Sequence, residues 1–400
     1  METPFSKSGN TQEDLPPKTK PGIGGWLKKN LFSSWYNTLL TILFAVLLYF
    51  IGKGTFGWFI DHAEWAVIRN NYKLFMAGQY PPDQIWRLWT CLGIISALFG
   101  ISAGVWKGTA RHLAVVFCLI CLLHLLMPFI SASSKIALAV LIAVTVVGYF
   151  AGPLVPKGRA VAIAGWLLSF PVSVFLIDGF GVLTPVGTNL WGGLLLTILL
   201  SIVAIVFAFP IGILAALGRT SRLPVIKYFC IIYIEAVRGV PLITVFFMAS
   251  LVIPLFLPEG LNIDAVIRAM IGATLFTAAY MAEYVRGGLQ AIPKGQREAA
   301  KAIGLNPVQT NLLIILPQAL RTIIPALVGQ SISLFKDTSL VSIVGLVDLL
   351  GIAQTVRSNP SYLGHAMEVF LFVALVYWVI ASAMSYTSRR LERTLGVGKR

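Results

Sequence analysis

Residues 296–317 read Gln296-Arg-Glu-Ala-Ala-Lys-Ala-Ile-Gly-Leu-Asn-Pro-Val-Gln-Thr-Asn-Leu-Leu-Ile-Ile-Leu-Pro317. Strong helix formers fill residues 298–303, Gly304 suits the C-cap of a short helix, and Asn306-Pro307 favours a turn. An apolar helix then begins at Ile314. The pattern therefore predicts a short helix, a glycine hinge and a second helix. A helix that lies amphipathically on lipid is the alternative interpretation of the first one.

Long apolar blocks lie on both sides of this segment and dominate the chain. Of the 400 residues, 57% are hydrophobic and 12% are charged, whereas a soluble domain carries roughly 25% charged residues. This composition excludes a set of water-soluble domains, and each block is long enough to cross about 30 Å of hydrocarbon as a helix. We predict an all-α polytopic membrane protein with about ten crossings, at residues 35–51, 88–106, 112–130, 135–156, 160–177, 190–217, 240–257, 265–283, 322–347 and 366–386.

The distribution of the +15 net charge predicts how the chain is oriented. Lys and Arg gather in every second loop, and the positive-inside rule places such loops in the cytoplasm. Residues 1–34 are then a disordered cytoplasmic tail, residues 391–400 are a second cytoplasmic tail, and both termini are cytoplasmic. Basic residues that flank membrane helices attract anionic lipid. The charge therefore indicates contact with membrane lipid and argues against nucleic-acid binding.

The first half of the chain holds no pattern of catalytic or metal-binding residues. Residues 35–180 are predicted to form about five membrane helices, with a polar loop at 52–87. Cys118, Cys121 and His124 lie on one helical face, but a metal site needs oriented ligands and usually a second cluster. We interpret the cysteines as small residues at a helix contact and expect no metal site. Gly100-x-x-x-Gly104 predicts a close approach of two helices.

The spacing inside residues 296–317 resembles the coupling-loop signature of ABC importer permeases. That signature is Glu-Ala-Ala, three residues, glycine, nine residues, and Ile-x-Leu-Pro, and it fits without a gap. The matching residues are Glu298, Ala299, Ala300, Gly304, Ile314, Leu316 and Pro317. In the family, the Glu-Ala-Ala helix sits in a groove of a cytoplasmic ATPase subunit and transmits its closure. The resemblance therefore assigns these residues to ATPase coupling.

The surrounding sequence resembles the polar amino-acid branch of these permeases. The similarity extends over about residues 187–390 and rests on 187–197, 233–242, 284–293 and 336–341. The first half, with Tyr80-Pro-Pro-Asp-Gln-Ile-Trp-Arg87, resembles the longer permease of general L-amino-acid uptake systems. The resemblance implies a five-helix type I permease core at 187–390, with the coupling loop at 294–317.

Several partners are implied by this resemblance. They are two cytoplasmic ABC ATPase subunits, a second and shorter homologous permease, and an extracytoplasmic amino-acid-binding protein, assembled at a bacterial inner membrane. The chain has no match to the phosphate loop G-x-x-x-x-G-K-[ST]. We therefore expect no catalytic residue and no cofactor on this chain, and we place ATP and its Mg²⁺ on the partner ATPase.

Two groups of residues are candidates for the transport path and its gating. Lys336, Asp337, Thr338 and Ser339 can offer partners to the ammonium and carboxylate of an amino acid, or they can simply mark a helix break near the outer interface. The i, i+3 pairs Glu235 with Arg238 and Glu283 with Arg286 can form on one helix face. Gly239 and Pro241 predict a helix break, which is either a gate hinge or a bend.

Two other function classes make different predictions. An ion-coupled secondary amino-acid carrier that acts alone would show an inverted repeat and several intramembrane carboxylates, and the sequence shows neither. A membrane-embedded enzyme would cluster His, Cys or carboxylates at one site, but the four histidines are scattered. The sequence does not specify which amino acids are carried or what the first half contributes.

Overall fold

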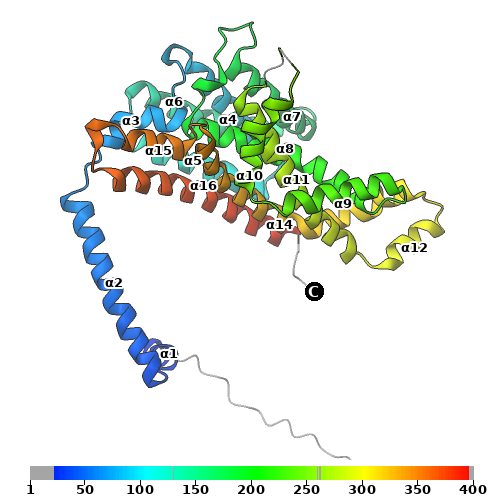
Figure 1. Ribbon diagram of the computed structural model, residues 1–400, viewed down its shortest axis with the longest axis horizontal. Helices are drawn as coiled ribbons and strands as arrows, with labels where there is room; N and C mark the ends of the chain where they lie inside the picture. The colour runs from blue at the N-terminus through cyan, green and yellow to red at the C-terminus, as the bar shows by residue number, and fades with distance from the viewer. Residues whose placement is uncertain (1–21, 129, 259, 261–262, 396–400) are drawn as a thin grey trace, which may run out of the picture. The chain divides into compact units, whose positions relative to one another are not determined.

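The computed structural model describes residues 22–128, 130–258, 260 and 263–395, and helices dominate these residues (Figure 1). The chain divides into two compact units, Met1–Ala63 and Glu64–Arg400. Of the helices within the described residues, nine are long and apolar enough to cross a membrane. A bent pair, Pro224–Arg238 with Leu242–Phe256, adds a tenth when it is counted as one span. The prediction of an all-α polytopic protein is confirmed.

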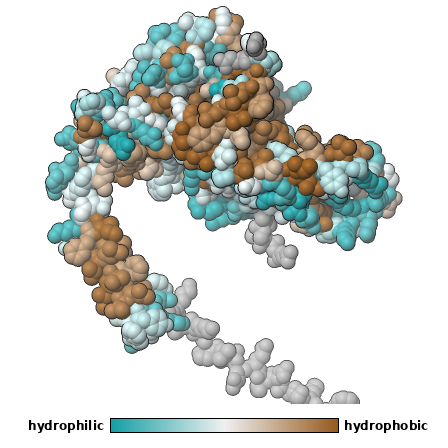
Figure 2. All heavy atoms as spheres, viewed as in Figure 1, coloured by the Kyte–Doolittle hydropathy of each residue, from teal (hydrophilic) through white to brown (hydrophobic). Residues whose placement is uncertain are grey.

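The first unit contains α1 (Ile23–Asn30) and the long α2 (Trp35–Asp61). Ser34 begins α2, because its side chain accepts a hydrogen bond from the Asn37 N–H at 3.4 Å. The surface of α2 is hydrophobic over most of its length (Figure 2). Residues 1–34 were expected to lack structure, but α1 lies within them; the remaining part of that prediction, residues 1–21, is outside the described residues.

The second unit begins with α3 (Ala66–Ala77), α4 (Trp86–Trp106), α5 (Gly108–Leu125), α6 (Ala132–Ala151) and α7 (Gly158–Asp178). The prediction of a polar loop at 52–87 is wrong, because that segment includes the end of α2 and all of α3. Val67, Ile68 and Phe75 of α3 are buried against α15 (Leu349–Arg357) and α16 (Ala366–Leu395). The polar residues Arg69, Asn70, Asn71 and Lys73 interrupt the apolar residues of α3 and obscure its helical spacing in the sequence.

Glycines bring α4 and α6 together. A Cβ atom on Gly100 would overlap the carbonyl oxygen of Thr145 and would lie 2.9 Å from Gly148 Cα. The Ser96 hydroxyl adds a hydrogen bond of 2.5 Å to the carbonyl of Leu141. The close approach predicted from Gly100-x-x-x-Gly104 is therefore confirmed, with α6 as the partner helix.

Gly100→Leu is expected to lower the thermal unfolding midpoint of the purified chain by about 5 °C, because overpacking costs about 1–3 kcal/mol. A fluorescence melt in detergent measures this effect. Gly93→Leu is the matched control on the same helix, since a Cβ at Gly93 meets nothing within 4 Å, and it should leave the midpoint nearly unchanged. Equal melts for the two variants would contradict the close α4–α6 contact.

The remaining long helices form the five-helix core. They are α8 (Gly193–Arg219), the broken span that contains α9 (Pro224–Arg238) and α10 (Leu242–Phe247), α11 (Ala265–Ala291), α14 (Leu316–Asp337) and α16. The chain bends by 107° between α9 and α10, at the Gly239–Pro241 segment. The predicted tail 391–400 is partly helical, because α16 runs to Leu395, and residues 396–400 are outside the described residues.

The packing of α8 against α11 shows that the broken span crosses the membrane. Gly212 of α8 lies against Met281 of α11, and further along both helices Arg219 contacts Glu283. The two helices are therefore parallel, so the chain must return across the bilayer between them. Only the α9–α10 pair lies there within the described residues, which gives ten crossings, as the sequence predicted.

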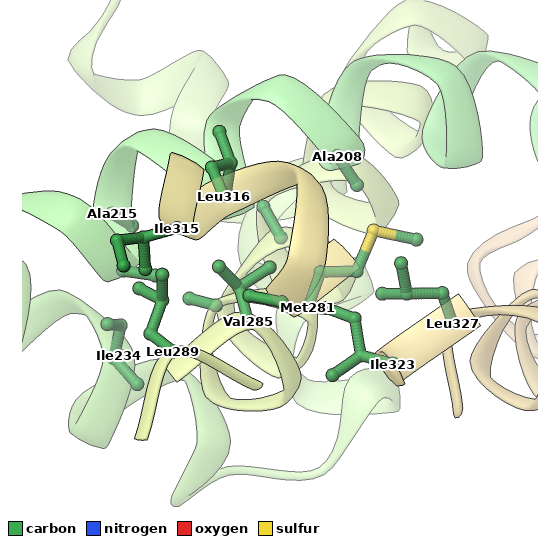
Figure 3. Close-up of a cluster of buried hydrophobic side chains, with 14 residues drawn as sticks. Ala208, Ala215, Ile234, Met281, Val285, Leu289, Ile315, Leu316, Ile323 and Leu327 are labelled. Carbon is green, nitrogen blue, oxygen red and sulfur yellow. The ribbon is translucent and has the colours of Figure 1, made fainter. Parts of the chain in front are cut away.

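A cluster of buried residues joins α8, α9, α11 and α14 (Figure 3). Ala208 and Ala215 of α8 allow close approach, while Val285 and Leu289 of α11 point toward Ile315. Small residues at such contacts let helix backbones come close together in a membrane. This cluster includes Ile315, in the segment that precedes α14. The buried core therefore reaches the predicted coupling residues.

Candidate functional site

The predicted coupling segment forms α12 (Lys294–Ala302), followed by a hinge. Gly304 has a φ of +82°, which is a left-handed conformation that glycine adopts without steric cost. Asn306 then caps the three-residue helix α13 (Pro307–Gln309), because its side chain accepts a hydrogen bond from the Gln309 N–H at 2.9 Å. The structure therefore has the short helix, the glycine hinge and the turn in the predicted order.

The two halves of the coupling motif lie in different environments. Within α12, whose residues are all described, only Ala300 is buried; Glu298 and Ala299 are exposed. The end of the second unit that carries α12 is largely hydrophilic (Figure 2). In the second half of the motif, Leu316 is buried in the core cluster, Ile314 packs against that cluster, and Pro317 lies in the first turn of α14.

A π-helical turn, η6 (Thr310–Ile315), connects these two halves. It packs against α12 on one side and continues into α14 on the other. Ile315 is fully buried in the core cluster. A continuous series of packed residues therefore links α12 to α14.

Charged side chains from three helices meet beside this core. The Glu283 carboxylate of α11 contacts Arg219 Nη1 at 2.9 Å, Arg286 Nη2 at 2.8 Å and Arg238 Nη1 at 3.5 Å. Arg219 of α8 also contacts Glu235 of α9 at 2.9 Å. We call these five residues the Glu283 cluster. It ties the end of α8 and the α9 side of the Gly239–Pro241 bend to α11.

The Glu283 cluster differs in part from the predicted ion pairs. Glu283 and Arg286 do pair within α11. Glu235 and Arg238, in contrast, each contact a residue of another helix: Glu235 contacts Arg219, and Arg238 contacts Glu283. Sequence reasoning missed Arg219, although it is the basic residue that ends an apolar block, because pairing across helices depends on how the helices pack.

The predicted substrate-path residues lie where α14 ends. Lys336 is exposed, and Asp337 is the last residue of the helix. Thr338 is fully buried, and its hydroxyl donates to the Phe335 carbonyl at 2.8 Å. Ser339 is half-buried in the 3₁₀ turn η7 (Thr338–Val344). The structure therefore places these four residues at a change of helix type, with their side chains in different environments.

Asp348, a buried carboxyl that sequence reasoning missed, lies beyond this turn. Its side chain accepts hydrogen bonds from the Gly351 N–H at 2.8 Å and from the Tyr377 hydroxyl at 3.2 Å. The adjacent Leu349 N–H donates to the Thr197 hydroxyl. Burial raises the pKa of Asp348 to about 6, although the hydrogen bonds from Gly351 and Tyr377 oppose this shift. The only signal in the sequence was an Asp at the N-cap of a short helix.

This raised pKa predicts a pH dependence of stability. Because the folded chain holds a proton that the unfolded chain releases near pH 4, stability should fall by about 3 kcal/mol between about pH 4 and pH 6 and then level off. Asp348→Asn should remove this component from unfolding midpoints measured across that range. Asp83→Asn, at an exposed carboxyl, is the control and should follow the wild type. Identical profiles for Asp348→Asn and wild type would contradict the assignment.

Within the described residues, no group of three or more His, Cys, Asp or Glu side chains is placed to hold a metal ion. Cys91, Cys118, Cys121 and Cys230 are free thiols, and all but Cys118 are buried. The distinctive features of the site are mechanical ones: an exposed helix, a hinge, and a cluster of ion pairs.

Comparisons with known proteins agree with this geometry. Residues 208–397 match the family model for the binding-protein-dependent transport system inner membrane component. The inner membrane amino-acid ABC transporter permease protein YhdY of Escherichia coli (strain K12) is 39% identical over 94% of this chain and 93% of its own length. The glutamate/glutamine/aspartate/asparagine transport system permease protein BztC of Rhodobacter capsulatus is 37% identical over 96% of this chain and 97% of its own.

A shorter relative matches only about half of the chain. The probable glutamine ABC transporter permease protein GlnP of Bacillus subtilis is 34% identical over 51% of this chain but 92% of its own length. The two long relatives, by contrast, match nearly the whole chain. The chain belongs to the family of amino-acid ABC transporter permeases.

Proposed function

We propose that this chain is the longer permease subunit of an ATP-driven importer that takes up L-amino acids, polar or of broad range, across a bacterial inner membrane. The observation that carries the proposal is the exposed α12, which is joined through η6 to the buried core. Full-length similarity to YhdY and BztC supports the substrate class. Both termini and α12 lie in the cytoplasm in this proposal, because the basic loops share that side.

The proposed complex contains several partners. Two cytoplasmic ABC ATPase subunits bind ATP with Mg²⁺, a second and shorter permease completes the membrane path, and an extracytoplasmic binding protein delivers the amino acid. Glu298, Ala299, Ala300 and Gly304 form the coupling helix and its hinge, whose exposed side sits in an ATPase groove, while Ile314, Leu316 and Pro317 join this helix to the core. A ligand shifts a conformational equilibrium only when its contacts differ between the states. The groove around α12 supplies that difference when the ATPase subunits close.

Lys336, Asp337, Thr338 and Ser339 are the proposed contacts along the solute path. They lie at the end of α14, which follows the coupling segment, and at the start of η7. A charge pair beside hydroxyl groups offers partners to both ends of an amino acid. Gly239 and Pro241 are the proposed gate hinge, and Glu235, Arg238, Glu283 and Arg286 hold the helices that move about it.

A single purification tests the proposal. An affinity tag on the full chain, isolated gently from its native membrane, should retain an ABC ATPase subunit that mass spectrometry identifies. Glu298→Lys is the matched control, which should insert equally well but lose the ATPase. An isolated chain that transports amino acids and never associates with an ATPase would instead favour a secondary carrier.

A further inference from the structure

The last two turns of α16 carry a cationic face that the transport mechanism does not use. Arg389, Arg390 and Arg393, together with Tyr386, line a cavity of about 350 Å³. Residues three and four positions apart share one side of a helix, so these side chains form one surface. Glu392, three residues after Arg389, lies at the edge of this surface, where it accepts a hydrogen bond of 3.2 Å from the buried Ser388.

The same outward face of α16 is apolar closer to its N-terminus. Leu371, Leu375 and Trp378 are exposed, and helical geometry places them in line with Tyr386. Along this face the side chains are first aliphatic, then aromatic, then cationic. A lipid-facing helix shows this order as it passes from hydrocarbon through the interface to the headgroups. The arginines lie about 5–10 Å beyond Tyr386 along the axis, at the depth of lipid phosphates.

The cationic face lies on the same side of the membrane as α12. Of the candidate spans, only those containing α14 and α16 lie between α12 and Arg389, a region whose backbone is described throughout. Two crossings return the chain to the side from which it started. The two helices pack against each other, and Phe335 of α14 contacts Tyr377 of α16 with ring centroids 5.3 Å apart.

We propose that Arg389, Arg390 and Arg393 bind the phosphate group of an acidic phospholipid on the side of the membrane that carries α12. Guanidinium groups pair with phosphate oxygens in a bidentate geometry, and Tyr386 lies at the level where the acyl chains begin. A bound lipid holds the end of α16 in place beside α14, which is the helix that receives the coupling motion. This site is independent of which solute is transported.

Native mass spectrometry of the full chain in detergent with defined amounts of phosphatidylglycerol and phosphatidylcholine tests the site. The triple variant Arg389→Gln, Arg390→Gln, Arg393→Gln should lower phosphatidylglycerol affinity by about 100-fold, given the attraction of each cation near acidic lipid. Phosphatidylcholine binding should not change. The matched control is Lys157→Gln, Arg159→Gln, Arg222→Gln, which removes the same charge from exposed positions in or beside basic loops that the positive-inside rule places on the same side, and it should retain wild-type affinity.

Three results would overturn the proposal. These are unchanged phosphatidylglycerol binding by the triple variant, equal loss in the control variant, or full displacement of the lipid by excess inorganic phosphate, which would make free phosphate the ligand. Thermal melts of both variants separate loss of the site from loss of the fold.

Discussion

Glu298→Lys is expected to reduce ATP-driven amino-acid uptake to background while the chain remains folded in the membrane. Glu298 is exposed on α12, so the change should cost the isolated chain little stability. Reversing the charge of a residue at a docking surface places like charges opposite each other, which costs several kcal/mol. This cost corresponds to a loss of at least about 100-fold in affinity for the ATPase. Uptake into vesicles that contain the whole complex measures the effect, together with the amount of ATPase retained.

Lys157→Glu is the control for this variant, because it reverses an exposed charge in a basic loop away from α12. It should leave both uptake and ATPase retention close to wild type. Gly304→Val is a second test, since a β-branched residue at φ +82° is strained by about 1–2 kcal/mol and should also impair coupling. Normal uptake by Glu298→Lys would contradict the docking role of α12.

Glu283→Gln is expected to lower uptake by about 30- to 160-fold, because it leaves three arginines without their shared counterion. The Glu283 side chain is only 15% exposed, and breaking such a partly buried pair costs on the order of 2–3 kcal/mol, which shifts a two-state equilibrium by that factor. We expect the variant to favour whichever conformation separates α8, α9 and α11. Uptake and nucleotide hydrolysis, measured on the same vesicles, test this.

Glu235→Gln is the matched control within the Glu283 cluster. Its side chain is 55% exposed and contacts Arg219, and exposed ion pairs contribute only about 0–1 kcal/mol. Uptake should therefore fall by less than about fivefold. A thermal melt shows whether Glu283→Gln is folded. If the folded variant has wild-type uptake, the Glu283 cluster stabilises the structure but takes no part in the conformational change.

Local chemistry explains which features could be predicted from the sequence. The short helix, the hinge at Gly304 and the Asn306 turn depend on neighbouring residues, and the apolar blocks depend only on length and composition. The α9–α10 break was also visible, because Gly239 and Pro241 are local signals. Each of these features is specified within a few residues.

Features that depend on packing between distant segments were missed. The helix α3 was missed because Arg69, Asn70, Asn71 and Lys73 interrupt its apolar residues. The contact of Arg219 with Glu283 exists because α8 and α11 run parallel, and its contact with Glu235 exists because α9 packs against α8. Asp348 carries no sequence signal for burial, since it is enclosed by Tyr377 and by residues of α8.

In the proposed mechanism, movement of α12, driven by a separate ATPase, powers transport through this chain. Reconstituted vesicles test it most directly, with labelled amino acid uptake measured for the full complex and for this chain alone. We predict that accumulation requires the ATPase, the binding protein and ATP, and that the chain alone accumulates nothing under an ion gradient. Concentrative uptake by the chain alone on a proton or sodium gradient, without nucleotide, would contradict the claim.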